Sequence, residues 1–259
     1  ALKQEKGRSM TLGFVLAPRS IPALQNFVFT ADYFKIDIDQ AIVSTPRTFI
    51  LDQCYSGNTA FCQFIKRRSS PVGANNAGSL EFVDSSVTNS GGLKTDGVDL
   101  AASFRDKVGP GNLSGRLAYT RLLGGSVVPS AGSSADVYAG EVGAAKNKFT
   151  LNLGYNYDKW GVRTTTIFIG KSALDDQFLK DYDLAPGSVT VASRTYMNAQ
   201  LTYALSKKSQ LYFGVDNVMD TKAPQLITGL PGNTTGAETA ASVYDPIGRR
   251  LYVGMRASF

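Results

Sequence analysis

The final segment of the chain, residues 249–259, limits the fold more than any other stretch. From Leu251 to Phe259 every second residue is apolar or aromatic, and most of the residues between them are polar or small. Successive side chains of a strand point to opposite faces, so this run predicts a strand with two different faces. Its length matches the ~9–11 residues that a tilted strand needs to cross a bilayer. A soluble edge strand has the same pattern, so the rest of the chain must decide between the two.

The same alternation recurs upstream, with turn residues between the runs. Together with the final segment it predicts nine strands, at residues 10–16, 27–33, 97–105, 113–119, 149–157, 163–170, 197–205, 211–215 and 251–259. The second face of these strands carries Thr, Asn, Gln, Gly and Ser with few charges, and aromatic residues gather towards the strand ends. Both features are typical of a lipid-facing band flanked by aromatic girdles. A soluble β-sandwich is the alternative.

The connections between these strands alternate between short and long. The long ones are at about residues 40–78, 124–145, 171–191 and 221–249. Outer-membrane barrels have short periplasmic turns and long external loops, which is the same arrangement. The predicted fold class is therefore all-β, an antiparallel transmembrane β-barrel. Nine antiparallel strands cannot close on themselves, and lipid does not tolerate open edges, so residues 1–259 are expected to be part of a larger barrel.

Composition excludes several other classes of protein. No apolar run approaches the ~20 residues of a membrane-spanning helix. The chain has no histidine, which removes Ser-His-Asp hydrolysis and histidine-ligated metal sites. There is no nucleophile–base pair, phosphate-binding loop or metal-ligand spacing, so we expect no enzyme, no metal and no cofactor. The net charge of +6 is spread over turns and loops, which does not indicate nucleic-acid binding.

The only two cysteines, Cys54 and Cys62, flank a Ser-Gly-Asn turn in the longest predicted loop. An even count at this spacing suits a disulfide that closes a short loop in an oxidising compartment. Such a bond contributes roughly 2–3 kcal/mol in the chain-entropy model. Two reduced, buried thiols are the alternative.

Five phrases, taken together and in order, resemble one family. Residues 217–224, NVMDTKAP, resemble the "NLFDxxxP" motif of TonB-dependent outer-membrane receptors, and 244–250, YDPIGRR, resemble the "YDxxGR" phrase before their last strand. Residues 2–8, LKQEKGR, are similar to the family's "LKPEKS", with Gln4 in place of the proline. Residues 32–42 and 92–99 resemble two further phrases of the family.

The resemblance implies a barrel of about 22 strands with a plugged lumen. Residues 1–259 would supply about nine C-terminal strands, and the plug domain, the TonB box and the earlier strands would lie outside them. The implied function is TonB-dependent import of a scarce nutrient, such as siderophore-bound iron or a carbohydrate, across the bacterial outer membrane. The implied partners are outer-membrane lipid, the remaining strands and plug, TonB, the barrel assembly machinery and a small-molecule ligand. A passive porin without a plug is the alternative, and a truncated product that serves in assembly is another.

In this family ligands are bound by loops and by the plug. The resemblance therefore makes the aromatic and basic residues around the cysteines candidates for ligand binding: Tyr55, Phe61, Lys66, Arg67 and Arg68. Aromatic rings stack on sugars or siderophores, and cationic side chains hold anionic groups. Ordinary solvated loop residues are the alternative.

The last strand also resembles the signal that the barrel assembly machinery reads. Gly254, Ala257 and the terminal aromatic Phe259 match its positions, although Ala257 is smaller than the usual residue there. Deletion of Phe259 is expected to lower the yield of protein in the outer membrane.

Overall fold

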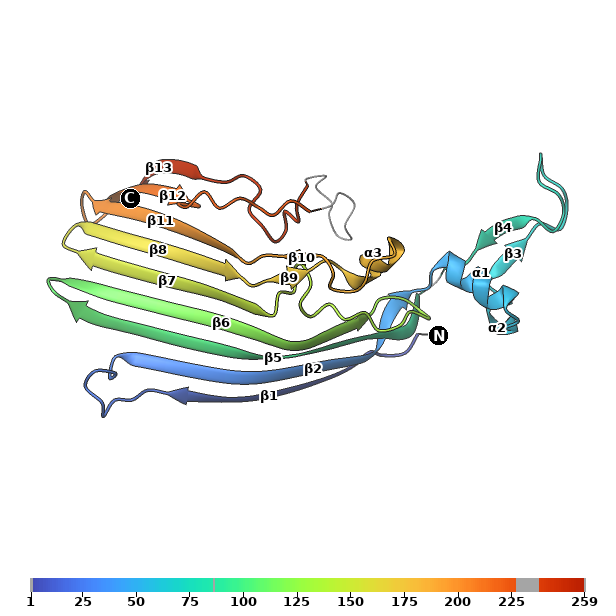
Figure 1. Cartoon of the computed structure of the whole chain (residues 1–259), viewed down its shortest axis with the longest axis horizontal. Coiled ribbons are helices and arrows are strands. Elements are labelled where there is room, and N and C mark those ends of the chain that lie inside the picture. Colours follow the sequence, from blue (N-terminus) through green and yellow to red (C-terminus); the bar gives the residue numbers. More distant parts are fainter. Residues whose placement is uncertain (1, 86, 227–237, 259) are drawn as a thin grey trace. The chain divides into compact units, whose positions relative to one another are not determined.

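A computed structural model describes residues 2–85, 87–226 and 238–258. Nine strands are hydrogen-bonded side by side in one sheet, in the order β1-β2-β5-β6-β7-β8-β11-β12-β13 (Figure 1). Each of the nine predicted strands overlaps one of these. Their bounds are β1 (Lys6–Leu16), β2 (Phe27–Ser44), β5 (Val87–Val108), β6 (Gly111–Val128), β7 (Asn147–Tyr157), β8 (Trp160–Ile169), β11 (Arg194–Ala204), β12 (Ser209–Asp216) and β13 (Arg250–Ala257).

Neighbouring strands from β6 to β13 run antiparallel. The strands β1 and β13 stand at the two ends of the sheet order. The predicted all-β, antiparallel fold is confirmed, and the strands form part of a barrel that is not closed.

Several strands are longer than the sequence predicted, most of all β2, β5 and β6, and β6 continues to Val128 although a loop was predicted from about 124. Alternation predicted a strand at 27–33 with a loop from about 40, but β2 continues to Ser44. Likewise β5 begins at Val87, ten residues before the predicted strand at 97–105. In β2 the added residues include a further alternating run, Phe34, Ile36 and Ile38, which the predicted strand left out. The added residues of β5 are mostly polar, and they pair because hydrogen bonding between backbones needs no apolar face.

The chain divides into two compact units, each described by itself. Unit 1 contains residues 1–9, 36–95 and 125–137. It holds α1 (Arg47–Tyr55), α2 (Thr59–Cys62), β3 (Ile65–Arg67) and β4 (Leu80–Val83). Leu80–Val83 pair with β3, whereas the residues from Val87 onwards belong to β5.

Unit 2 contains residues 10–35, 96–124 and 138–259. Its predicted long loops include β9 (Ser172–Ala173), α3 (Asp176–Asp181) and β10 (Thr190–Val191). None of the helices among the described residues is long and apolar enough to cross a membrane.

Register gives the strands of unit 2 one apolar and one polar face. Leu151 of β7 lies opposite Leu117 of β6, whereas its neighbour Asn152 lies opposite Arg116. On the apolar face, the rings of Phe149 and Phe168 stack with centroids 5.0 Å apart. This face is substantially open: Val253, for example, is 79% exposed. So large an exposed apolar surface is costly in water and is expected where a protein meets lipid.

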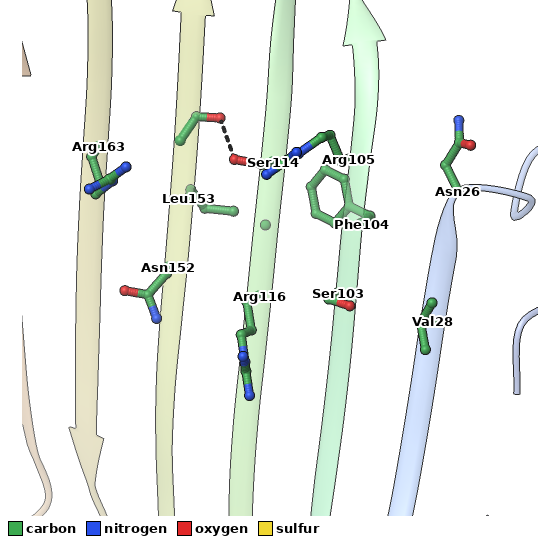
Figure 2. Close-up of a pocket in the computed structure, with 12 residues that line it drawn as sticks. Asn26, Val28, Ser103, Phe104, Arg105, Ser114, Arg116, Asn152, Leu153 and Arg163 are labelled. Atoms are coloured by element: carbon green, nitrogen blue, oxygen red, sulfur yellow. Dashed lines mark hydrogen bonds between the residues drawn. The ribbon is translucent and has the colours of Figure 1, made fainter. Parts of the chain in front are cut away.

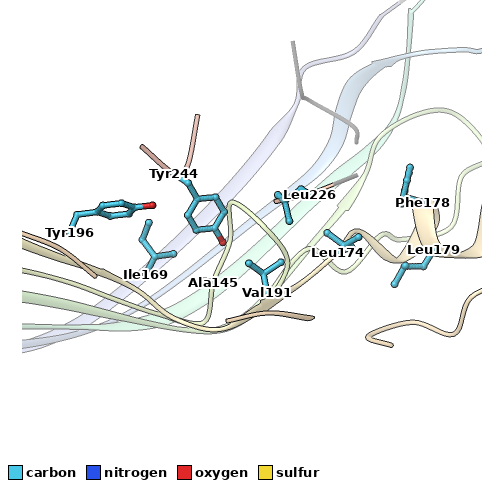
Figure 3. Packing of buried hydrophobic residues seen from close by; sticks show 9 residues of the cluster. All are labelled: Ala145, Ile169, Leu174, Phe178, Leu179, Val191, Tyr196, Leu226 and Tyr244. Carbon is cyan, nitrogen blue, oxygen red and sulfur yellow. The ribbon is translucent and has the colours of Figure 1, made fainter. Parts of the chain in front are cut away.

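The hydrophobic core of unit 2 lies among its loops rather than on the sheet (Figure 3). Tyr244, Leu174 and Leu179 are at most 2% exposed. Around them pack residues from the ends of β8 and β11 and from the connections, namely Ala145, Ile169, Phe178, Val191, Tyr196 and Leu226. The long connections of this unit are therefore held by a core of their own.

Candidate functional site

An open groove of about 510 Å³ lies on the polar face of the sheet in unit 2 (Figure 2). Three arginines from three different strands line it: Arg105 of β5, Arg116 of β6 and Arg163 of β8. We call it the arginine groove. Its other lining residues are Asn26, Val28, Ser103, Phe104, Ser114, Gly115, Asn152, Leu153 and Gly154.

Strand register places the three arginines on one face. Arg116 lies opposite Asn152 of β7, and Arg163 lies opposite Gly154, two residues further along the same strand. Residues directly opposite each other in a sheet share a face, and so do residues two apart. The Cα atoms of Arg116 and Arg163 are thus roughly 12 Å apart, two strand spacings across and two residues along.

Arg105 lies on the same face as Arg116 because its neighbour Phe104 occupies the opposite face. A Cβ atom at Gly115 would lie 2.2 Å from the ring of Phe104, so Phe104 occupies the Gly115 face. Its neighbour Arg105 must then point to the opposite face, which is that of Ser114 and Arg116. Figure 2 shows the Arg105 side chain extending towards Ser114 of the next strand.

The groove is cationic and rich in hydrogen-bond donors. Across the described parts of the chain, none of the three guanidinium groups takes part in a hydrogen bond or an ion pair, and all three side chains are exposed. No aspartate or glutamate is among the lining residues. The Asn152 carboxamide oxygen accepts a hydrogen bond of 2.8 Å from Thr165, which leaves its NH₂ group free to donate. Such a wall is suited to binding oxyanions.

The predicted disulfide is confirmed. Cys54 lies in the last turn of α1, Cys62 is the last residue of α2, and the two residues are bonded with their Cα atoms 4.9 Å apart. The two ring candidates beside it differ in their surroundings. Tyr55 is 95% exposed. Phe61 makes an edge contact with Phe49, with ring centroids 5.4 Å apart, and so helps to pack the two helices together.

The basic candidates of this loop make contacts within it. The Lys66 ammonium lies 3.5 Å from the Glu81 carboxylate and 5.4 Å from the centre of the Phe82 ring. Arg67 donates a hydrogen bond of 2.9 Å to the backbone oxygen of Gly78. Arg68 follows β3 and exchanges backbone hydrogen bonds with residues 78 and 79. These contacts explain the shape of the hairpin, and a role in ligand binding stays a prediction.

Two of the three candidate assembly residues lie in β13, and Phe259 lies outside the described residues. Gly254 faces Tyr212 of β12, and a Cβ atom there would lie 2.3 Å from the Tyr212 hydroxyl. Gly214 faces Tyr252 in the same way, with 2.0 Å to the ring. Each tyrosine ring thus covers the glycine opposite it, so Gly254 has a packing role whatever its role in assembly.

The sequence prediction did not include the three groove arginines. Each lies in a predicted strand next to one apolar residue, namely Phe104, Leu117 or Val162, so its place on the polar face could be predicted from the sequence. The convergence of the three arginines could not be predicted, because it depends on which residues of separate strands lie opposite each other.

Comparison with known proteins was made on the sequence and on the fold. The family model described as TonB dependent receptor-like, beta-barrel matches residues 1–218. No curated protein matches the chain. Among solved structures, a mutant ferric enterobactin receptor of Pseudomonas aeruginosa is 20% identical with a TM-score of 0.58, and the match covers 100% of this chain and 32% of that one.

Two further structures are similar in fold. The FrpB iron transporter of Neisseria meningitidis is 12% identical with a TM-score of 0.56, over 99% of this chain and 32% of that one. The pyoverdine receptor FpvA of P. aeruginosa, bound to pyoverdine, is 15% identical with a TM-score of 0.50, and the match covers 98% of this chain and 30% of that one. The chain therefore spans about a third of the length of these structures.

Proposed function

Because this chain belongs to the TonB-dependent receptor-like β-barrel family, we propose that it supplies barrel wall and external loops to an active importer of a scarce nutrient. The family consists of transporters and receptors of the bacterial outer membrane, and that membrane is where this chain resides. The observation that carries the proposal is the two-faced antiparallel sheet of nine strands, eight of which lie within the residues 1–218 that match the family.

The two faces of the sheet have different surroundings in this proposal. The apolar face, with Leu153, Leu201 and Phe213 partly exposed, contacts outer-membrane lipid. The polar face, with the arginine groove, lines the lumen. The strands at the two ends of the sheet, β1 and β13, pair with the remaining strands of the barrel, since lipid does not tolerate unpaired strand edges. The barrel assembly machinery inserts the complete barrel into the outer membrane.

The long connections, at about residues 40–78, 124–145, 171–191 and 221–249, are proposed to face the cell exterior, and the short ones the periplasm. Energy comes from TonB, which acts on a box and a plug domain outside residues 1–259. The substrate is siderophore-bound iron, a carbohydrate or a similar nutrient. The names of the similar structures concern ferric enterobactin, iron and pyoverdine, which supports the iron-carrier option for this chain. The protein performs no enzymatic step.

The disulfide-bonded loop is proposed to contact the ligand from outside. Tyr55 is the strongest of the five candidates, because its ring is 95% exposed beside the constrained helix pair. Lys66, Arg67 and Arg68 present positive charge along the neighbouring hairpin, and Phe61 holds the helices that carry Tyr55.

The test is nutrient uptake in the native organism. Removal of the gene region that encodes residues 1–259 is expected to abolish growth on one scarce iron or carbohydrate source, and a plasmid copy is expected to restore it. Uptake through the complemented protein should stop when a protonophore collapses the proton-motive force. Uptake that continues after this treatment would indicate a passive porin instead. Unchanged growth across a panel of iron carriers and sugars would contradict the proposal.

A further inference from the structure

The arginine groove gathers positive charge that the described chain does not neutralise. Two other strand cations do have a carboxylate partner: the Arg250 guanidinium lies 3.4 Å from Asp216, and the Lys94 ammonium lies 3.9 Å from Asp37. Arg105, Arg116 and Arg163 have no carboxylate partner among the described residues. Like charges on one wall repel each other, and a bound anion relieves that repulsion.

We propose that the arginine groove binds a multivalent oxyanion, a small solute that carries two or three carboxylate or phosphate groups. A guanidinium group offers a planar pair of N–H donors that matches both of these groups, and its charge does not depend on pH in the physiological range. Three such groups, with the Cα atoms of Arg116 and Arg163 about 12 Å apart, can surround one compact solute.

Hydrogen bonding in the groove favours an anion over a neutral sugar. Asn26 and Asn152 add amide donors, and Ser103 adds a hydroxyl. The hydroxyl of Ser114 already donates to the backbone oxygen of Gly154, at 3.3 Å. A sugar hydroxyl needs acceptors as well as donors, and the lining has no carboxylate to accept from it. The ring of Phe104 lies over Gly115 on the opposite face and offers no platform for stacking.

The place of the groove connects this site to transport. Arg105 lies near the short turn after Val108, and Arg163 lies near the short turn before Trp160. The volume of about 510 Å³ is within the usual range of small-ligand sites, ~300–1,000 Å³. This reading rests on the proposed function: the imported solute is anionic and passes this wall at the periplasmic end of the lumen. Lipid phosphate is not the ligand, because the groove opens on the face opposite the apolar one.

The first experiment measures binding directly. The protein that carries residues 1–259 is extracted from outer membranes in a neutral detergent and titrated calorimetrically with citrate, with pyrophosphate and with sucrose. Citrate, pyrophosphate or both are expected to bind with one site per chain, and the comparison of the two shows whether carboxylate or phosphate is preferred. Sucrose is expected not to bind. Absence of binding by both anions up to about 10 mM, a very weak affinity, would overturn the proposal.

A pair of matched variants tests whether the three arginines form the site. R105Q/R116Q/R163Q removes three positive charges from the groove, and K159Q/K207Q/K208Q removes three from short turns outside it. All six side chains are exposed, so both variants are expected to fold. The arginine variant should weaken anion binding by about tenfold or more, because it removes charge-assisted contacts. The lysine variant should bind as the parent does, and equal weakening in both would overturn the site.

Failure of the site and failure of the proposed function give different results. The protein could bind anions through the three arginines while nutrient uptake stays normal after gene removal. That result would support the anion site and contradict the import function. Energy-dependent uptake together with absence of anion binding would leave import standing and overturn the anion site.

Discussion

At the scale of single residues, Asn217 and Asp220 organise the turn that follows β12. Asn217 is 1% exposed and has a positive φ of 52°. Its Nδ2 group donates to the backbone oxygen of Thr221, and its Oδ1 accepts from the Thr221 N–H, both at 2.9 Å. The motif NVMDTKAP therefore has a structural explanation here: one buried amide side chain closes the turn from inside.

Replacement of Asn217 should destabilise the protein measurably. Asn217→Ala leaves two backbone groups of the half-buried Thr221 without these partners and keeps the strained φ, at a cost of roughly 2–4 kcal/mol in unfolding free energy. Asn217→Gly loses the same hydrogen bonds, but glycine adopts a positive φ without strain. The loss of unfolding free energy should therefore be about 1 kcal/mol smaller for Asn217→Gly than for Asn217→Ala. Urea unfolding of the purified variants in detergent measures both. Parent-like stability in Asn217→Ala would contradict this account of the turn.

Asp220 links the same turn to the start of β13 in a way that depends on pH. Its Oδ2 accepts from the Lys222 ammonium at 2.9 Å, and its Oδ1 accepts from the Arg249 N–H at 3.1 Å. The hydrogen bond from Lys222, and then that from the Arg249 backbone, lower the pKa of the Asp220 carboxyl below its usual 3.8. A lowered pKa means that the carboxylate favours the folded turn above the usual value, and that this contribution is lost as pH falls through the lowered one.

We therefore expect the Arg249 amide to lose protection in acid. Hydrogen exchange, corrected for the intrinsic rate, should show protection that is constant near neutral pH and that is lost in acid, as pH falls below the usual carboxyl value of 3.8 and through the lowered pKa. Asp220→Asn retains an acceptor oxygen and cannot titrate, so its protection should not change over this range. Asp158→Asn, in a different turn, is the control and should behave as the parent does. The same acid dependence in Asp220→Asn would refute the link.

At the scale of elements, β12 and β13 are held together by two reciprocal glycine–tyrosine pairs. Tyr212 covers Gly254, and Tyr252 covers Gly214. The Gln200 amide of β11 also donates to the Tyr252 hydroxyl, at 3.1 Å. The polar face of the last strands is thus filled by aromatic rings that need a residue without a side chain opposite them.

A methyl group at Gly254 should disturb this packing. Gly254→Ala places a Cβ atom 2.3 Å from the Tyr212 hydroxyl, so we expect a loss of about 1–3 kcal/mol in unfolding free energy. With Tyr212→Ala already present, the same change should cost much less, because the obstacle is gone. Gly7→Ala is the matched control, since nothing lies within 4 Å of a Cβ atom there. Equal cost of Gly254→Ala in both backgrounds would disprove the contact.

The elements also show what the sequence could and could not predict. All nine strands of the sheet were predictable, because a strand between two different surroundings must alternate, as β7 does from Phe149 to Tyr157. The hairpin of β3 and β4 was missed, since three or four residues are too few to show a period. The helix α3 was also missed. The Phe178 N–H donates to the N-cap residue Asp175 at 2.7 Å, but the helix has only six residues, too few to show a helical period in the sequence.

At the scale of the whole molecule, family membership was predictable from five short phrases in order, whereas the anion site was not. Family motifs such as 217–224 and 244–250 lie at turns and strand starts, where backbone geometry restricts the residue type. The groove arginines lie inside ordinary alternating strands, and only the register brings Arg105, Arg116 and Arg163 to one wall. Sequence patterns within one strand do not specify register between strands.

The measurement that tests the central claim most directly is a scan of β7 with spin labels. Cysteine is placed at each position from 149 to 156, one at a time, in the protein reconstituted in lipid, and each label's exposure to oxygen and to a water-soluble relaxation agent is recorded. A barrel wall predicts strict alternation: Phe149, Leu151, Leu153 and Tyr155 should contact lipid, and Thr150, Asn152 and Asn156 should contact water. Equal exposure of both sets to water would show that β7 does not separate lipid from a lumen, and would contradict the barrel-wall account.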